Sequence, residues 1–350
     1  MKSYRIAAIP GDGIGREVIP AGIEVLDKLQ DGFRLEFEQF DWSSERYLET
    51  KAYIPEGGLE KLKKFDAILF GAVGSPHVPD HVSLWGLRLP ICQGFDQYAN
   101  VRPSRLLPGI QSVLKNAHEI DWVIVRENTE GEYSGAGGRV HQGLSNETAV
   151  EVSTFTRSGV ERVHRFAFEL ARKRPRRHLT LVTKSNAQRH GMVLWDEIFY
   201  EVARAFPDVR TDRILVDAMT TRMVLKPAAI DTVVASNLHA DILSDLAAAL
   251  SGSLGIAPTA NLDPERRFPS MFEPIHGSAF DITGKGIANP IGTFWTASMM
   301  LEHLGETKAA ARLMKAIESV TAKKIFTPDL GGSARTKDVT AAVIAVLGDS

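Results

Sequence analysis

The chain has 350 residues, 44% of them hydrophobic, which is enough for about two domains with a sizeable core. The formal net charge of −2 argues against a nucleic-acid partner. A single cysteine, Cys92, rules out a disulfide framework, and no run approaches the roughly 18 apolar residues that span a bilayer, so we expect a cytoplasmic protein with no membrane partner.

In chain order, the apolar patterns predict strand 4–9, helix 16–28, and strands 33–40, 67–70 and 122–125. They continue with helix 159–173, strand 179–183, helix 192–205, strands 214–216 and 232–235, and helix 241–250. Helices 290–304, 307–322 and 337–347 complete the chain. The alternation of strands and helices predicts an α/β fold with mainly parallel sheets flanked by helices. Because no flexible linker is present, we expect the chain to cross between two domains more than once.

The segment IPGDGIGREV, residues 9–18, follows the first predicted strand and invites comparison with a dinucleotide-binding fingerprint. That fingerprint requires G-x-G-x-x-G and an acidic residue that closes the next strand. Here Gly11, Gly13 and Gly15 are spaced G-x-G-x-G, and Asp41 lies too far along to be that acidic residue. The pattern therefore predicts a tight strand-to-helix turn and a non-Rossmann cofactor site elsewhere in the chain.

Two aspartates in the segment SNLHADILSDLAAAL form the first candidate site. Asp241 and Asp245 are four residues apart on a predicted helix, so their carboxylates project from one face. The helix follows strand 232–235, and open α/β sheets bind ligands at the carboxyl ends of their strands. Carboxylates without thiols suit Mg²⁺ or Mn²⁺, and Asp217, after another predicted strand, is a candidate third ligand. A solvated acidic helix face, with Asp217 as a helix cap, is the alternative.

Two further motifs place polar side chains at strand ends. In VRENTEGEYSG, Arg126 ends a strand and could bind a carboxylate, and Tyr133 follows in a glycine-containing loop and could donate a proton. In TKSN, Lys184 comes directly after a strand, and a lysine near a cation can act as a base. The alternatives are an ion-paired loop arginine and an ordinary surface lysine.

The segment FEPIHGSAFDITGKGIANP, residues 272–290, is too long and too rich in glycine and proline for a simple connection. Its backbone N–H groups could bind a phosphate, and Asp281 could accept hydrogen bonds from ribose hydroxyls. A carboxylate at that position would repel a 2′-phosphate, which favours NAD over NADP.

Together these motifs resemble those of the β-decarboxylating dehydrogenases, the family of isocitrate and 3-isopropylmalate dehydrogenases. The resemblance covers essentially the whole chain and is carried by IPGDGIGREV, NVRP, RENTEGEY, TKSN, NLHADILSDL and EPIHGSAFDITGKGIANP. It implies a two-domain, isopropylmalate dehydrogenase-like α/β fold. Residues 1–99 and 253–350 would form a large cofactor-binding domain. Residues 100–252 would form a small domain with the dimer interface and the metal and substrate residues.

The resemblance also implies a role for each matching residue. Arg102 and Arg126 would bind the substrate carboxylates. Lys184 would take the hydroxyl proton, and Tyr133 would protonate the enolate. The implied metal ligands are Asp217, Asp241 and Asp245, and the implied cofactor contacts are Glu273, His276, Gly277, Ser278, Ala279, Asp281 and Asn289. One position departs, because Cys92 stands where the family commonly has another carboxylate-binding arginine, for which Arg88 could compensate.

The activity that the resemblance implies is metal-dependent, NAD-linked oxidation and oxidative decarboxylation of a small 2-hydroxy dicarboxylic acid. The segments SLWGLRLPICQGFDQYANVRP and DPERRFPSMFEP favour tartrate and D-malate as substrates, with 3-isopropylmalate as the alternative. The cofactors would be NAD and Mn²⁺ or Mg²⁺, with a K⁺ requirement left open. Lys184 and Asp217 would come from the neighbouring subunit, so a homodimer would share its active sites. A non-catalytic regulatory subunit of the same fold is the other alternative, but it should have lost catalytic side chains that this chain retains.

Overall fold

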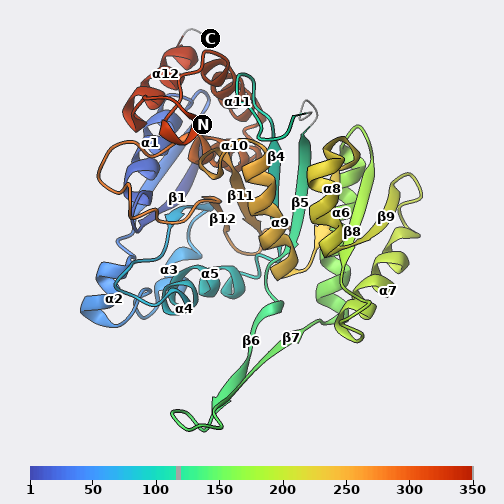
Figure 1. The fold of residues 1–350 in the computed structure, drawn as a ribbon. Coiled ribbons are helices and arrows are strands. Elements are labelled where there is room, and N and C mark those ends of the chain that lie inside the picture. Colours follow the sequence, from blue (N-terminus) through green and yellow to red (C-terminus); the bar gives the residue numbers. More distant parts are fainter. Residues whose placement is uncertain (116–119, 349–350) are drawn as a thin grey trace. The chain divides into compact units, whose positions relative to one another are not determined.

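The computed structural model describes residues 1–115 and 120–348. The chain divides into two compact units, and its course through them can be followed by colour in Figure 1. The first unit contains Met1–Gln97, Arg105–His118 and Ala248–Ser350, and the second contains Tyr98–Ser104 and Glu119–Ala247. The chain thus passes between the units more than once. The segment Arg105–His118 belongs to the first unit, whereas we expected it within the small domain of residues 100–252.

In the first unit the strand order is β2-β1-β3-β12-β11. These strands are β1 (Lys2–Gly11), β2 (Phe33–Gln39), β3 (Ala67–Ala72), β11 (Pro258–Leu262) and β12 (Ser270–Pro274). Strand β1 pairs in parallel with β2 and β3, and β12 pairs in parallel with β3, whereas β11 is antiparallel to β12. Every residue of β3 is buried, because helices cover both faces of this central strand.

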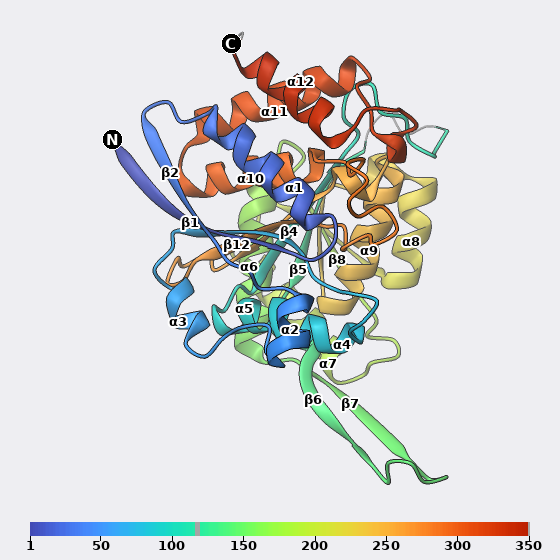
Figure 2. The same ribbon diagram turned by 90° about the vertical axis from the view of Figure 1, so that its left-hand side faces the viewer.

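Helices cover these strands from two sides (Figure 2). One side carries α1 (Gly15–Asp27), α10 (Ile291–Leu304), α11 (Thr307–Ala322) and α12 (Thr336–Gly348). Two 3₁₀ turns, at Leu254–Ile256 and Pro328–Leu330, lie elsewhere in the unit. The other side carries α2 (Ser44–Thr50), α3 (Gly58–Leu62), α4 (Asp80–Ser83), the π-helical turn Leu84–Arg88 and α5 (Leu89–Gly94). Successive residues of β1 point to opposite sides, so Ile6 joins the core beneath α1 and Ala7 joins the other core. Cys92 is fully buried in that second core.

In the second unit the strand order is β4-β5-β10-β8-β9. The elements are β4 (Ala99–Arg105), β5 (Asp121–Glu127), α6 (Arg157–Lys173), β8 (His178–Thr183), α7 (Gly191–Ala203), β9 (Arg210–Leu215), α8 (Val216–Leu225), a 3₁₀ turn at Pro227–Ala229, β10 (Thr232–Ala235) and α9 (Asn237–Leu250). Helix α6 begins after Thr156, whose hydroxyl oxygen accepts a hydrogen bond from the N–H of Gly159 and caps the helix. Strands β5, β10, β8 and β9 are parallel. The residues that follow β5, β8 and β10 therefore lie at one edge of the sheet, where such sheets bind ligands.

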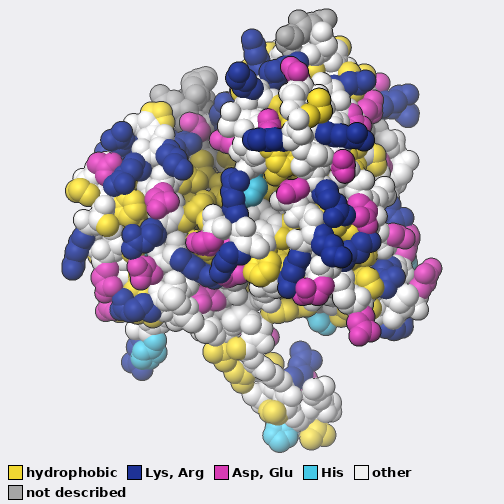
Figure 3. Space-filling view, turned by 180° about the vertical axis from the view of Figure 1, so that it is seen from behind, with side chains coloured by type: hydrophobic (Ala, Val, Ile, Leu, Met, Phe, Trp, Pro, Cys, Tyr) yellow, Lys and Arg dark blue, Asp and Glu magenta, His cyan; other side chains and the backbone are white. Residues whose placement is uncertain are grey.

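A hairpin of two antiparallel strands, β6 (Gly131–Val140) and β7 (Thr148–Thr154), projects from the second unit. All residues of β7 are exposed, among them Val150 and Val152. Figure 3 shows hydrophobic side chains, in yellow, along this arm. An isolated two-stranded hairpin is only marginally stable in water, so we expect another protein surface to cover it.

The prediction of an α/β fold with mainly parallel strands flanked by helices is confirmed, and most predicted elements are present with ends shifted by a few residues. Two predicted boundaries near the candidate site residues were wrong. The strand expected at 214–216 ends at Leu215, so Asp217 lies in the first turn of α8. The loop expected from residue 272 begins after Pro274, because Glu273 belongs to β12. Over the part of the chain that the structure describes, no helix is both long and apolar enough to cross a membrane.

The core of the second unit contains a buried histidine. His164 on α6 is fully buried, and its ring centroid lies 4.3 Å from that of Trp195 and 5.4 Å from that of Phe199. Among the described residues, neither ring nitrogen has a hydrogen-bond partner. Burial lowers the pKa of His164 to about 3, because the charged ring would lose its hydration.

We therefore expect His164→Phe to make the stability of the protein less sensitive to acid. The unfolded chain protonates this histidine near pH 6.5, whereas the folded chain does so only near pH 3. The contribution of His164 to the free energy of unfolding should therefore fall by about 1.4 kcal/mol for each pH unit between 6.5 and 3. Above pH 6.5 this contribution should be constant. Urea unfolding of both proteins between about pH 4 and 8 measures the difference. Parallel pH profiles would contradict the expectation.

Candidate active site

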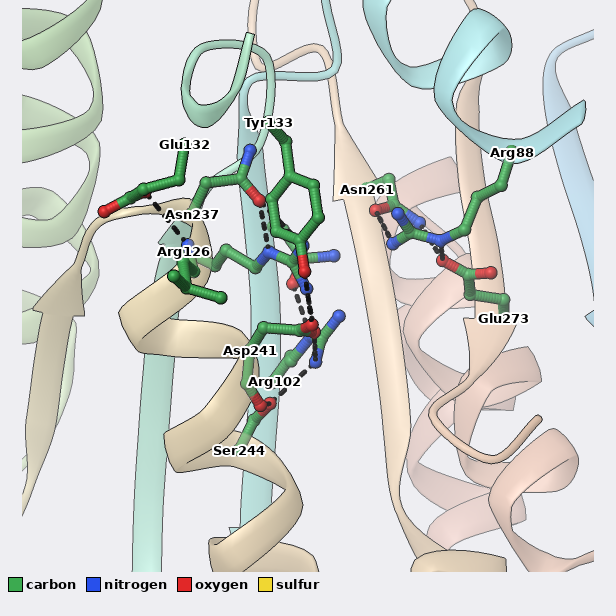
Figure 4. A network of polar contacts seen from close by, with 12 residues as sticks. Arg88, Arg102, Arg126, Glu132, Tyr133, Asn237, Asp241, Ser244, Asn261 and Glu273 are labelled. Atoms are coloured by element: carbon green, nitrogen blue, oxygen red, sulfur yellow. Dashed lines mark hydrogen bonds and ion pairs between the residues drawn. The ribbon is translucent and has the colours of Figure 1, made fainter. Parts of the chain in front are cut away.

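In the second unit, two arginines and a tyrosine converge on one aspartate (Figure 4). Arg126 and Arg102 both form ion pairs with Oδ1 of Asp241 on α9, the Arg102 contact measuring 3.1 Å. The hydroxyl of Tyr133 donates to Oδ2 of Asp241 over 3.1 Å, and the Arg126 guanidinium lies 5.2 Å from the centre of the Tyr133 ring. Strands β4, β5 and β6 and helix α9 thus bring together four residues that the motifs predicted for the site.

Neutral side chains hold both arginines in place. Arg126 is 3% exposed and donates from Nε and Nη2 to the side-chain oxygen of Asn237, at 2.9 and 2.7 Å. Arg102 is 5% exposed and donates to Asn100 over 2.7 Å and to the hydroxyl of Ser244 over 2.6 Å. Because these amide and hydroxyl partners carry no charge, they orient the two guanidinium groups without neutralising them, and both groups contact the carboxylate of Asp241.

The carboxylates of α9 have the chemistry of a site for a hard divalent cation. Asp241 and Asp245 are one helical turn apart on the same side of α9. The pKa of the Asp245 carboxyl is raised, first because the surrounding protein removes part of its hydration and also because Asp241 is negatively charged, although Arg102 and Arg126 act in the opposite direction. Bound Mg²⁺ or Mn²⁺ would favour the ionised carboxylate. The two aspartates therefore fit such an ion.

Lys184 and Asp217 form a separate pair in the second unit. Lys184 follows β8, and its Nζ lies 2.5 Å from Oδ1 of Asp217. This contact holds the pKa of the Asp217 carboxyl below its usual range. Within residues 1–115 and 120–348, no three acidic, histidine or cysteine side chains gather into a group that could hold a metal. Asp217 therefore does not complete a three-carboxylate site with Asp241 and Asp245 in the same chain.

A buried acid supports the loop that leads to Tyr133. Glu127, at the end of β5, accepts hydrogen bonds from the N–H groups of Thr129 and Glu130 at 2.8 and 3.0 Å, and from the Thr129 hydroxyl at 2.9 Å. Burial raises the pKa of Glu127 to about 7, although these bonds favour its ionised form. The loop is thus held from within, which fixes the start of β6.

Three residues that the motifs did not single out shape the site, namely Asn237, Ser244 and Glu132. The first two orient the arginines. Glu132 accepts a hydrogen bond from the Ser236 hydroxyl over 2.8 Å and one from the N–H of Leu238 over 3.1 Å, and so ties β6 to the start of α9. All three lie within the motifs RENTEGEY and NLHADILSDL. The sequence of a motif does not reveal which polar side chain contacts which partner.

In the first unit, Arg88 forms a buried ion pair with Glu273 (Figure 4). The Nε of Arg88 donates to Oε1 of Glu273 over 2.8 Å, and its Nη2 donates to the side-chain oxygen of Asn261 over 3.2 Å. The Asn261 amide donates to the same Glu273 oxygen over 2.8 Å and closes the network. The arginine expected at the substrate and the first expected cofactor contact therefore hold each other in place.

The other expected cofactor contacts lie in the loop between β12 and α10. The Nδ1 of His276 lies 3.0 Å from the next carbonyl oxygen along the chain, and burial lowers the pKa of this histidine. Asp281 is exposed, so a ribose could reach its carboxylate. Asn289 is buried, and its side chain donates to Asp329 over 3.0 Å and accepts from the N–H of Ile291 at the start of α10. The Asn289 side chain is thus engaged with protein partners.

Several known proteins are similar to this chain over nearly its whole length. The family model described as isocitrate/isopropylmalate dehydrogenase matches residues 5–343. A probable tartrate dehydrogenase/decarboxylase of Agrobacterium vitis is 67% identical over 355 aligned positions, which cover 100% of this chain and 98% of that protein. The D-malate dehydrogenase (decarboxylating) of Escherichia coli strain K12 is 51% identical, with 99% of each chain covered. The crystal structure of isocitrate dehydrogenase from Methylococcus capsulatus matches with a TM-score of 0.89 at 33% identity, covering 98% of this chain and 99% of that one.

Proposed function

Since this chain belongs to the isocitrate/isopropylmalate dehydrogenase family, we propose that it catalyses the metal-dependent, NAD-linked oxidation and oxidative decarboxylation of tartrate and D-malate. Membership of the family, which the motifs predicted, makes the chain a dehydrogenase. The observation that carries the proposal is the convergence of two buried arginines and a tyrosine on a carboxylate of α9. The similarity to relatives named for tartrate and D-malate supports the choice of substrates.

Arg102 and Arg126 would bind the carboxylates of the substrate. Each side chain is buried and oriented by neutral partners, so little conformational entropy is left to lose when an anion binds. Asp241 and Asp245 would hold Mn²⁺ or Mg²⁺, which polarises a substrate oxygen when bound. A small dicarboxylate with a hydroxyl group would suit this cluster, because its carboxylates could bind the two arginines and its oxygen atoms could bind the metal.

Lys184 and Tyr133 would move the protons of the reaction. The Lys184 amine would remove the hydroxyl proton as the substrate is oxidised, while NAD supplies the hydride acceptor. Oxidation of D-malate gives a β-keto acid, and loss of CO₂ from it leaves an enolate. The Tyr133 hydroxyl, which points to Asp241 over 3.1 Å, would give its proton to that enolate and yield pyruvate.

The loop between β12 and α10 would hold the cofactor, through Glu273, the residues from His276 to Ala279, Asp281 and Asn289. The exposed carboxylate of Asp281 supports NAD over NADP, because it can accept hydrogen bonds from ribose hydroxyls and would repel a 2′-phosphate. The K⁺ requirement and the cytoplasmic location stay predictions from the sequence.

We also propose that two chains share each active site. Lys184 and Asp217 form their own pair, and they match the residues that a neighbouring subunit supplies in the family. The β6–β7 arm supports pairing, because Leu144 and Val140 at its tip are 61% and 56% exposed. Exposed apolar side chains on an unpaired hairpin mark a protein interface, so we expect the arms of two chains to cover each other.

Asp245→Asn should weaken Mn²⁺ binding at least about tenfold, which is about 1.4 kcal/mol. The change replaces an anionic ligand with a neutral amide of the same size, so the fold should be unaffected. Titration with Mn²⁺, followed by the electron paramagnetic resonance signal of the unbound ion, gives the affinity. Asp27→Asn, at an exposed position of α1, is the matched control. Wild-type affinity in the folded Asp245 variant would remove α9 from the metal site.

The rate of NADH formation with D-malate, tartrate, 3-isopropylmalate and isocitrate, each with Mn²⁺ or Mg²⁺, tests the proposed function. We expect D-malate and tartrate to be turned over and 3-isopropylmalate to be poor, because its branched substituent needs an apolar wall where LRLPICQGF carries Arg88 and Gln93. A tenfold preference for 3-isopropylmalate, about 1.4 kcal/mol of transition-state stabilisation, would overturn the substrate assignment. Absence of turnover with all four would favour a regulatory subunit.

A further inference from the structure

The opening segment IPGDGIGREV binds the proposed cofactor loop within the first unit. Figure 1 draws that loop, residues 275–290, in orange beside α1. The backbone N–H of Ile14 donates to the carbonyl of Ser278 over 2.8 Å. At Gly13, where φ is +54°, a Cβ atom would lie 1.9 Å from the same carbonyl oxygen, so only glycine allows this approach. The segment is therefore a support for the loop.

Asp12 anchors this support to the rest of the first unit. Its carboxylate accepts hydrogen bonds from the N–H and the hydroxyl of Ser44, at 2.7 and 2.6 Å, and from the N–H of Gly74 at 2.9 Å. The aspartate is buried, so these bonds are strong and shielded from water. The turn that contacts the loop is consequently fixed before any ligand arrives.

Glu17, in the first turn of α1, binds the far part of the loop. Its Oε1 accepts a hydrogen bond from the N–H of Gly284 over 2.7 Å, and its Oε2 lies 3.5 Å from the hydroxyl of Thr336 at the start of α12. Thr336 itself donates two hydrogen bonds to the loop. Its N–H donates to the carbonyl of Gly286 over 3.0 Å, and its hydroxyl donates to the carbonyl of Ala288 over 2.7 Å. The loop is thus held at several points by α1 and α12.

We propose that Glu17 is a positioning residue for cofactor binding, which holds the loop in the conformation that presents Asp281. This inference rests on the proposed cofactor site at residues 273–289. Asp281 lies in the chain between the two supported points, Ser278 and Gly284. Ordering a flexible loop on binding costs conformational entropy, and a loop that is already held avoids that cost.

Glu17→Ala should raise the Kd for NADH about tenfold, whereas Glu17→Gln should stay within about twofold of the wild type, because glutamine keeps an oxygen that can accept the Gly284 N–H. The Kd is measured from the fluorescence of bound NADH without substrate. The kcat for D-malate at saturating NAD should not change. Glu24→Ala, at an exposed position on the same helix, is the matched control and should bind NADH like the wild type.

Hydrogen exchange without any cofactor gives a second measure of the loop itself. Peptides covering residues 275–290 should exchange faster in Glu17→Ala than in the wild type, and at the wild-type rate in Glu17→Gln and Glu24→Ala. Thr336→Val removes the hydroxyl that contacts both Glu17 and Ala288. It should weaken NADH binding in the same way, and it serves the test if Glu17→Ala does not fold.

A wild-type Kd for NADH in Glu17→Ala and Thr336→Val would overturn the proposal, even if the loop exchanged faster. Equal losses of NADH affinity in Glu17→Ala and Glu17→Gln would also contradict the proposal, because glutamine retains an oxygen that can accept the hydrogen bond from Gly284. Failure of the wild type itself to bind NADH would be a different result. It would remove the cofactor site, and with it both the proposed function and the role of Glu17.

Discussion

Replacement of Tyr133 by phenylalanine should lower the turnover of D-malate by about 10²–10⁴-fold, the usual contribution of a positioned proton donor. The variant loses only the hydroxyl, which donates to Asp241 over 3.1 Å. The ring can keep its place 5.2 Å from the Arg126 guanidinium. We expect KM for D-malate to change little, because the arginines that would bind its carboxylates are unaltered.

The loss should fall on the conversion of the β-keto acid into pyruvate, in which Tyr133 would protonate the enolate left by the loss of CO₂. Oxaloacetate, the β-keto acid formed by oxidation of D-malate, tests that step alone through the rate of pyruvate formation. Tyr200→Phe, at an exposed tyrosine of α7, is the matched control and should keep wild-type rates. Wild-type pyruvate formation from both D-malate and oxaloacetate in the Tyr133 variant would assign the proton transfer to another residue or to water.

The second large effect is expected in the stability of the first unit. Arg88→Leu should lower the free energy of unfolding by about 3–5 kcal/mol, because it leaves the carboxylate of Glu273 buried without its cation. The amide of Asn261 still donates to that carboxylate but cannot neutralise it. Urea unfolding measures the change. In the control Arg157→Leu, the lost pair with Glu201 is exposed and contributes only about 0–1 kcal/mol. Equal stabilities of Arg88→Leu and the wild type would contradict the expectation.

A double variant separates the contribution of Arg88 to stability from a role at the substrate. Arg88→Leu/Glu273→Leu removes both charges and should recover most of the lost stability. The ratio of kcat/KM for tartrate to that for D-malate then reports on the substrate, because a loss of the proposed cofactor contact at Glu273 would affect both reactions alike. A ratio below that of the wild type would support a contact with the 3-hydroxyl of tartrate. An unchanged ratio would confine Arg88 to a structural role.

Elements with a strong local pattern could be predicted from the sequence. Helix α11 was predicted with the bounds that the structure shows, Thr307–Ala322, because its apolar residues recur at helical spacing and form one buried face. Strand β7 was missed although Val150 and Val152 alternate with Glu151 and Ser153, because the alternation is short and none of its residues is buried in a core. The short strands β11 and β12 were also missed, because pairing with each other and with the distant β3 stabilises them and leaves little local signal.

For the site, the strand-end pattern drew attention to Arg126, Tyr133 and Asp241, and the family resemblance added Arg102. The structure brings these four side chains together, and their roles stay predictions. The motifs could not predict the partners. Arg126 is oriented by Asn237, 111 positions away, and Arg88 pairs with Glu273, 185 positions away. Such pairings depend on how the strands and helices pack, which neither spacing nor composition reveals.

A mixture of two inactive variants tests most directly whether two chains form one decarboxylating site. In a dimer of one Lys184→Met chain and one Tyr133→Phe chain, a shared arrangement leaves one site intact and places both defects in the other. Random mixing, by unfolding and refolding the chains together, should then restore pyruvate formation from D-malate to about a quarter of the wild-type rate. Each variant alone should stay near background. A mixture no more active than the separate variants would contradict the shared site.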